Sequence, residues 1–239
     1  MGRRSASPSR PGRFRYGVEA PYALGGLAAA GLVFLAAAGW WRSPALAVAA
    51  VVLFVQAGFF LHSTVRGKHR VWEREVDRLN LDGPERLLDL GCGRGAVLII
   101  AARRLPWGLA VGVDLWRTRD QSGNASGVTL ANAAAAGVAD RVGLCTVDMT
   151  ALPFADGTFD VVTSALAVHN IPTADGRARA LDEAVRVLRP GGRLLLADFR
   201  HTEEYRRHLG PAADVRSLGP CYWYGGPWAA TRMVTLAKP

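Results

Sequence analysis

The sequence predicts an α/β domain, with a mostly parallel sheet between layers of helices, preceded by two helices long enough to cross a membrane. Two uncharged runs of about twenty residues stand near the N-terminus. An apolar run, Leu87–Leu90, is broken by an acid and closes on three alternating glycines. Further apolar strands then alternate with helical segments down to residue 200, among them a helix expected from Ala180 to Leu188 and a strand from Arg193 to Phe199. The 239-residue chain has room for one such domain and a smaller addition.

The two uncharged runs predict a membrane hairpin over residues 21–62. No charged residue occurs from Pro21 to Trp41, and after Arg42 a second run reaches His62. At 1.5 Å per residue each helix is about 30 Å long, which matches the hydrocarbon core of a bilayer. Small residues recur in the first run and would let the two helices, or a second copy of the chain, approach closely. They are Gly25, Gly26, Ala29, Ala30 and Gly31.

Two other interpretations of this region remain open at this point. A secretory signal peptide would use Arg3, Arg4 and a cleavage site at residues 36–38, but its apolar core should be shorter and no second run should follow. A buried hairpin of a soluble protein would need a partner surface. The rest of the chain is already used by the α/β domain, so a membrane hairpin is favoured.

Charge predicts the orientation of the hairpin and limits the partners of the domain. Residues 1–80 hold 11 Lys/Arg against 4 Asp/Glu, and residues 81–239 hold 18 against 16. Basic residues precede the first run, in a polar tail (1–20) expected to be disordered, and follow the second. The positive-inside rule then puts both termini and the domain on the cytoplasmic side of the cell membrane. A domain with so little net charge favours no nucleic-acid partner.

The three cysteines and the segment after the hairpin complete this outline. Cys92, Cys145 and Cys221 have no spacing typical of disulfides or metal sites, so we expect no metal. Residues 63–81 predict an amphipathic connecting helix, with apolar residues at helical spacing from Lys68 to Leu81. This helix could serve as a lid over a ligand pocket or simply pack against the domain. The domain itself is assigned to residues 82–239.

The glycine turn and a later acid predict a nucleotide-type ligand. Glycines at this position permit a sharp strand-to-helix turn and close approach of a ligand to the backbone. Asp114 ends the next apolar strand about twenty residues later, where a carboxylate can bind ribose hydroxyls. Asp89 to Gly95 reads D-x-G-x-G-x-G, and residues 188–198 read L-R-P-G-G-R-L-L-L-A-D. On these motifs the chain resembles the class I S-adenosylmethionine-dependent methyltransferases. The glycine spacing of NAD-binding proteins fits less well.

The resemblance implies a Rossmann-like sheet of seven strands whose last strand is antiparallel. It also implies S-adenosylmethionine as cofactor and S-adenosylhomocysteine as product. By the same resemblance, the glycine turn surrounds the methionine and ribose, Asp114 binds the ribose, and two short segments enclose the adenine. The cofactor-binding residues expected in this way are Asp89, Gly91, Cys92, Gly93, Gly95, Asp114, Leu115, Trp116, Asp148 and Met149.

The acceptor side is less defined by the sequence. His169 follows the fourth strand, at the edge that in this family faces the transferred methyl, and is the candidate catalytic base. Residues 221–228 contain four aromatic side chains, which could pack on one another, line an acceptor pocket or touch the bilayer interface. The expected function is methylation of a small lipophilic acceptor at the membrane. The alternative is a catalytically silent S-adenosylmethionine-binding sensor or scaffold.

Overall fold

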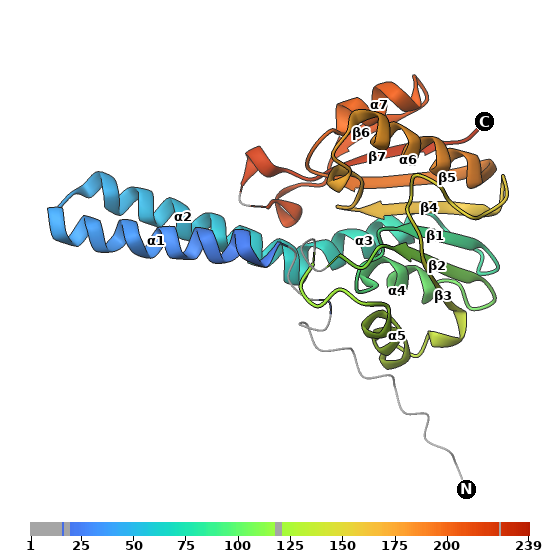
Figure 1. The fold of residues 1–239 in the computed structure, drawn as a ribbon, viewed down its shortest axis with the longest axis horizontal. Helices are drawn as coiled ribbons and strands as arrows, with labels where there is room; N and C mark the ends of the chain where they lie inside the picture. Colours follow the sequence, from blue (N-terminus) through green and yellow to red (C-terminus); the bar gives the residue numbers. More distant parts are fainter. Residues whose placement is uncertain (1–15, 17–19, 118–120, 225) are drawn as a thin grey trace, which may run out of the picture.

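The computed structural model describes every residue except 1–15, 17–19, 118–120 and 225. It consists of an α/β domain and a helical hairpin that projects from one end of it (Figure 1). The tail expected to be disordered, residues 1–20, lies outside the described residues apart from Tyr16 and Ala20.

The hairpin is formed by α1 (Pro21–Trp41) and α2 (Pro44–His62). The chain reverses at Arg42, which has a left-handed backbone, and Pro44 starts the second helix. Gly31 is buried against α2, where a Cβ would come within 2.9 Å of the Phe54 ring. Gly25 has no atom within 4 Å of the corresponding position. The apolar stretches of the two helices are only 6% and 11% buried, so the α/β domain does not cover them.

The second helix of the hairpin continues into the domain. A π-helical turn, η1 (Ser63–Gly67), joins it to α3 (Lys68–Asp77), and the helical stretch from Pro44 to Asp77 has 34 residues. The apolar face of α3 is buried against the domain, as the amphipathic pattern predicts. This helix ends four residues before Leu81, and Asn80 then adopts a left-handed backbone at φ 45°.

The sheet has seven strands in the order β3-β2-β1-β4-β5-β7-β6. All neighbours from β3 to β5 are parallel, whereas β7 is antiparallel to both β5 and β6. The predicted sheet with an antiparallel last strand is therefore confirmed. The strands are β1 (Arg86–Leu90), β2 (Leu109–Asp114), β3 (Val142–Thr146), β4 (Phe159–Ala165), β5 (Leu188–Asp198), β6 (Asp214–Ser217) and β7 (Arg232–Ala237).

Helices cover both faces of this sheet (Figure 1). One layer contains α3, α4 (Ala96–Ala102) and α5 (Ser126–Ala135), and the other contains α6 (Ala174–Val187) and α7 (Thr202–Leu209). Short 3-10 turns also occur, at η2 (Ala139–Arg141), η3 (Val168–Asn170), η4 (Pro220–Tyr222) and η5 (Pro227–Ala229). Leu87 belongs to the apolar core on one face of the sheet, and Leu88 belongs to the core on the other face. Strand β1 is therefore buried on both faces, as its continuous apolar run predicts.

Two boundaries differ from the sequence prediction. Helix α6 was expected from Ala180, but it begins at Ala174 because the Thr173 hydroxyl caps it by accepting a hydrogen bond from Gly176 N. Strand β5 was expected from Arg193, but it begins at Leu188 and contains the Pro-Gly-Gly turn. The end of β7 holds that turn in register, since Gly191 N donates to Lys238 O at 2.8 Å.

The loop of residues 219–230, here called the aromatic loop, joins the hairpin to the domain. A bridge between Trp223 and Ala230 closes the loop. The rings of Trp223 and Tyr224 contact Phe59 and Phe60 of α2, with ring centroids 6.2 and 5.1 Å apart. The Ser63 hydroxyl donates to Trp223 O at 2.6 Å. These contacts make the hairpin and the aromatic loop one packed unit.

Candidate active site

A pocket opens where β1, β2 and β4 end at the same edge of the sheet. In the sheet, β2 and β3 lie on one side of β1, and β4 and β5 lie on the other. The order in which the chain adds strands therefore reverses at β1. Ligands of open α/β sheets bind at such a point, outside the carboxyl ends of the strands. The pocket has a volume of about 200 Å³ and is lined by residues from these strand ends, α3 and the aromatic loop.

The glycine turn forms the floor of the pocket. Gly91, Gly93 and Gly95 all have positive φ, at 67°, 51° and 82°. A Cβ on Gly91 would lie 2.2 Å from the Cβ of Ala167, which follows β4. The turn is also tied to β2, because Gly91 N and Cys92 N both donate to Val113 O. A side chain at Gly91 is therefore excluded by the segment after β4, and the backbone itself faces the pocket.

Asp89 lies in the pocket wall with its carboxyl group buried. It is 2% exposed, and the Thr163 hydroxyl on β4 donates to its Oδ1 at 2.8 Å. Burial raises the pKa of Asp89 to about 7, against the opposing effect of the Thr163 hydrogen bond. Near neutral pH this group is therefore divided between its protonated and ionised forms.

The raised pKa predicts a pH-dependent stability that Asp89→Asn should change. Between pH of about 4 and about 7 the folded chain keeps a proton that the unfolded chain has released, so rising pH destabilises the fold in this window. The resulting loss in the free energy of unfolding is about 4 kcal/mol, and it is complete above pH 7. Denaturant unfolding should show Asp89→Asn gaining stability over the wild type across this window. Asp148→Asn, which removes an exposed carboxylate of the same pocket, is the control. A constant difference between Asp89→Asn and wild type would contradict the prediction.

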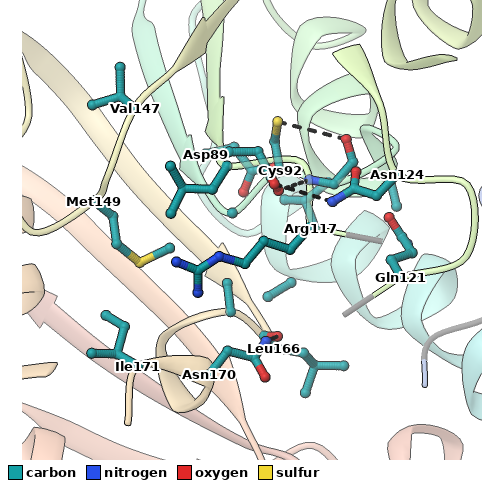
Figure 2. A pocket seen from close by; sticks show the side chains of 18 of the residues that line it. Asp89, Cys92, Arg117, Gln121, Asn124, Val147, Met149, Leu166, Asn170 and Ile171 are labelled. Carbon is teal, nitrogen blue, oxygen red and sulfur yellow. Dashed lines mark hydrogen bonds between the residues drawn. The ribbon is translucent and has the colours of Figure 1, made fainter. Parts of the chain in front are cut away.

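Asp114 holds the glycine turn and the next loop together. Its Oδ2 accepts from Gly93 N at 2.8 Å, and its Oδ1 accepts from Trp116 N at 2.6 Å. Asn124 Nδ2 also donates to Oδ1, at 3.2 Å. Each carboxylate oxygen has about two acceptor directions, so Oδ2, which accepts one hydrogen bond within the domain, can still receive one from a ligand. Figure 2 shows Asn124 and Gln121 on this side of the pocket.

The opposite side of the pocket is more apolar. Val147, Met149 and Ile171 lie there (Figure 2), and Leu115 and Asp148 also line the pocket. Figure 2 shows Met149 and Ile171 facing the cavity across from Cys92. The carboxylate of Asp148 accepts from the backbone N and the hydroxyl of Thr150, both at 2.9 Å, which fixes its orientation.

Two predicted cofactor residues do not line the pocket. Trp116 turns away from it, because its indole Nε1 donates to Thr146 Oγ1 at 2.8 Å. Gly95 lies behind the turn, where a Cβ would meet Thr129 at 2.8 Å, and serves the backbone geometry at the start of α4. The other eight are brought together by the strand ends, namely Asp89, Gly91, Cys92, Gly93, Asp114, Leu115, Asp148 and Met149.

The candidate base His169 lies beside the pocket rather than in its wall. Its ring packs on Phe199 with centroids 4.8 Å apart, and its Nδ1 is 2.9 Å from Asp198 Oδ1, without hydrogen-bond alignment. The adjacent Asn170 lines the pocket instead. Asp198 was missed by the sequence interpretation, although it ends β5 just as Asp114 ends β2. An acid as the last residue of a strand was the sequence signal that could have identified Asp198.

The fourth wall comes from segments outside the recognised motifs. Lys68 and Trp72 of α3 and Tyr222 of the aromatic loop line the pocket and are at most 3% exposed. The indole Nε1 of Trp72 is buried and has no hydrogen-bond partner among the described residues. Buried N–H donors are nearly always paired, so a ligand atom that accepts this hydrogen bond would explain it.

Comparisons with known proteins agree with this geometry. Residues 88–196 match a family described as a methyltransferase domain. The chain is 38% identical to the ubiquinone/menaquinone biosynthesis C-methyltransferase UbiE of Roseobacter denitrificans over 134 residues. This match covers 56% of the chain and 50% of that protein. The chain is also 35% identical over 152 residues, 63% of the chain, to the 27-O-demethylrifamycin SV methyltransferase of Amycolatopsis mediterranei, covering 52% of that protein. The chain thus spans about half the length of the relatives it matches.

Solved structures show the same fold. The [4+2]-cyclase SpnF aligns with a TM-score of 0.58 at 21% identity, over 74% of this chain and 84% of that one. At this identity the likeness concerns the fold and not the reaction. The sheet order, the glycine turn with its acids and the matched domain together lead to one assignment. Residues 88–196 belong to a methyltransferase-domain family, and the domain around them has the fold of the class I S-adenosylmethionine-dependent methyltransferases.

Proposed function

We propose that this chain is a membrane-anchored methyltransferase that transfers a methyl group from S-adenosylmethionine to a small lipophilic acceptor at the cytoplasmic face. One observation carries the proposal. The second apolar helix runs through η1 into α3, and α3 supplies Lys68 and Trp72 to the pocket wall. The pocket thus lies at the base of the hairpin, where an acceptor dissolved in a bilayer would arrive.

The residues of the pocket fit this cofactor. The glycine turn leaves backbone exposed where a Cβ would collide with Ala167, which suits a ligand lying against the chain. Asp114 would receive the ribose hydroxyls, and Asp148 with Met149 would hold the adenine. Lys68 and the unpaired Trp72 Nε1 suit an oxygen-bearing group of a ligand. When bound, the cofactor supplies an electrophilic methyl group.

The chain's own contribution is to position the acceptor and exclude water. Displacement at a methyl carbon depends on holding the nucleophile about 3 Å away and in line. Asn170, Ile171 and Tyr222 line the acceptor side of the pocket and would orient the acceptor. Tyr222 is fully buried, and it comes from the loop that contacts the hairpin.

The nature of the acceptor is supported by three facts. The relatives are named for ubiquinone or menaquinone and for a demethylrifamycin, which are small organic acceptors. The domain has nearly balanced charge, which disfavours a nucleic acid. The hairpin exposes many large apolar side chains that water would disfavour and a bilayer would accept, among them Leu32, Val33, Val51 and Val55.

Methylation of a lipid-soluble acceptor is the test of this proposal. Purified full-length protein is incubated with methyl-labelled S-adenosylmethionine and a bacterial lipid extract, and label is counted in the organic phase. We expect label in an organic product, and Asp114→Ala should weaken cofactor binding about 10- to 100-fold by calorimetry, since it removes charge-assisted hydrogen bonds. Cofactor binding without turnover would favour a sensor or scaffold instead.

Removal of the candidate base should separate chemistry from binding. If His169 accepts the acceptor's proton, His169→Ala should lower turnover about 100-fold or more with little change in cofactor affinity. The neighbouring variant Asn170→Ala is the matched comparison, because Asn170 lines the pocket and His169 lies behind it. Turnover that depends on Asn170 and not on His169 would remove the base role from the histidine.

A further inference from the structure

A second cavity lies between α2 and the aromatic loop. It has a volume of about 430 Å³ and is lined by Val55, Gly58, Phe59 and His62 of the hairpin and by Pro220 and Cys221 of the loop. All of these except His62 are apolar or weakly polar. Gly58 is exposed and has no atom within 4 Å of its Cβ position, so the helix surface is open there. We call this cavity the hairpin groove.

The hairpin groove and the methyltransferase pocket are lined by neighbouring residues of the same two segments. Cys221 lines the groove, and the next residue, Tyr222, lines the pocket. On the helical side, His62 lines the groove and Lys68, less than two turns further on, lines the pocket. Between them Gly67 contacts the loop backbone so closely that a Cβ would overlap Cys221 O. This contact positions the loop so that Cys221 lines the hairpin groove and Tyr222 lines the pocket.

Aromatic rings continue from the groove toward His169. Phe59 contacts Trp223 and Phe60 contacts Tyr224. Tyr224 in turn lies 6.2 Å from Phe199, whose ring is 4.8 Å from that of His169. Flat apolar surfaces of this kind suit an aromatic or unsaturated acceptor and its chain.

The groove opens on the apolar surface of the hairpin. Val55, at one end of it, is 52% exposed and belongs to a helix with mean hydropathy of 2.2 over its apolar stretch. If the hairpin spans a bilayer, this opening faces hydrocarbon and not water. A hydrocarbon chain gains little free energy by moving from lipid into such a groove, so the groove would align the chain rather than extract it.

We infer that the hairpin groove holds the hydrocarbon chain of the acceptor, with the chain entering from the bilayer and the reactive head reaching the pocket past Tyr222. The inference rests on the proposed function and names the binding site for the tail of its substrate. A water-soluble acceptor would have no use for an apolar groove beside a membrane span. The groove therefore defines the substrate class as amphiphiles with a long apolar chain.

Photolabelling tests the groove without requiring turnover. The full-length protein is placed in phosphatidylglycerol/phosphatidylethanolamine vesicles that contain a long-chain alkylphenol with a diazirine in its chain. After illumination, labelled peptides are identified by mass spectrometry. We expect label at residues 55–62 and 220–221, reduced by the same alkylphenol without diazirine and not by phenol. Label spread evenly over α1 and α2 would overturn the inference.

Filling the groove gives a matched pair of variants. Gly58→Phe places a ring in the groove. Gly26→Phe places the same ring at an equally open position on α1, near the same end of the hairpin and outside the groove. Labelling at residues 220–221 should fall about tenfold in the first variant and stay unchanged in the second. Val55→Trp fills the groove from another residue if Gly58→Phe does not fold. Equal labelling in the filled variants and the wild type would also overturn the inference.

These results are separable from those on the proposed function. Labelling confined to the groove, in a protein that methylates no lipid-extract component, would leave the groove assigned and the methyltransferase proposal contradicted. Methylation of a chain-bearing lipid at equal rates by wild type, Gly58→Phe and Val55→Trp would support the methyltransferase proposal and overturn the groove.

Discussion

Replacing Gly91 by alanine is expected to abolish measurable S-adenosylmethionine binding. The new Cβ would lie 2.2 Å from the Cβ of Ala167, and the φ of 67° is unfavourable for any residue with a Cβ. The left-handed backbone costs about 1–2 kcal/mol and overpacking about 1–3 kcal/mol. Either the turn or the segment after β4 must move, and both line the pocket. A loss of at least about 100-fold in affinity should follow, measured by calorimetry.

The control for this substitution separates backbone strain from crowding. Gly137 has a similar φ of 72° but no atom within 4 Å of its Cβ position, and it lies after α5, outside the pocket. Gly137→Ala should lower the melting temperature slightly while cofactor affinity stays at the wild-type value. If Gly91→Ala bound the cofactor as well as Gly137→Ala does, the glycine turn would not be the cofactor site.

Replacing Gly67 by alanine is expected to separate the aromatic loop from the hairpin. A Cβ there would lie 1.6 Å from Cys221 O. No rotation of a side chain can relieve this overlap, because the helix backbone fixes the Cβ position and the oxygen belongs to the loop backbone. The loop must lift away from η1, with a loss of about 1–3 kcal/mol of stability. Since Tyr222 and Cys221 move together, methylation of a bilayer-borne acceptor should fall about tenfold or more. Cofactor affinity should change less, because the glycine turn and Asp114 are on other elements.

Gly26→Ala is the control for Gly67→Ala. Both glycines lie in helical segments, but no atom lies within 4 Å of the Cβ position of Gly26, which lines neither the pocket nor the hairpin groove. Denaturation, limited proteolysis of the aromatic loop and methyl transfer into lipid should all remain near wild type in this control. A Gly67→Ala protein with wild-type stability and an equally protected loop would contradict the contact on which the prediction depends.

These two predictions address the two halves of one site. In the proposed enzyme the strand ends would hold the cofactor, whereas α3 and the aromatic loop would contact the acceptor. Glu75 of α3 pairs with Arg216 of β6, and the Ser63 hydroxyl bonds Trp223 O, so the hairpin is fastened to the domain at several points. A helix that leaves the apolar hairpin and enters the pocket wall links anchoring to substrate access in the proposed enzyme.

Much of the domain was predictable because its signals are local. The apolar run before Asp89 predicts a strand buried on both faces, and the alternating glycines predict the turn that follows. Asp114 ends β2 and Asp148 follows the end of β3 by two residues, and the carboxyl ends of parallel strands meet at one edge. The family resemblance added the antiparallel last strand, and the helix α6 boundary was misplaced because the Thr173 cap lay outside the apolar pattern.

The acceptor half of the site was decided by tertiary structure. Nothing in the local sequence relates Lys68 and Trp72 to Tyr222, some 150 residues later, because their meeting depends on how η1 and α3 pack against the aromatic loop. The same holds for His169, which strand order brings to the correct edge but which packs against Asp198 and leaves the pocket wall to Asn170. The sequence by itself determined the individual strands, the glycine turn and the apolar hairpin, since each depends on neighbours in the chain. Only the packing of distant segments decided which side chains complete the pocket wall.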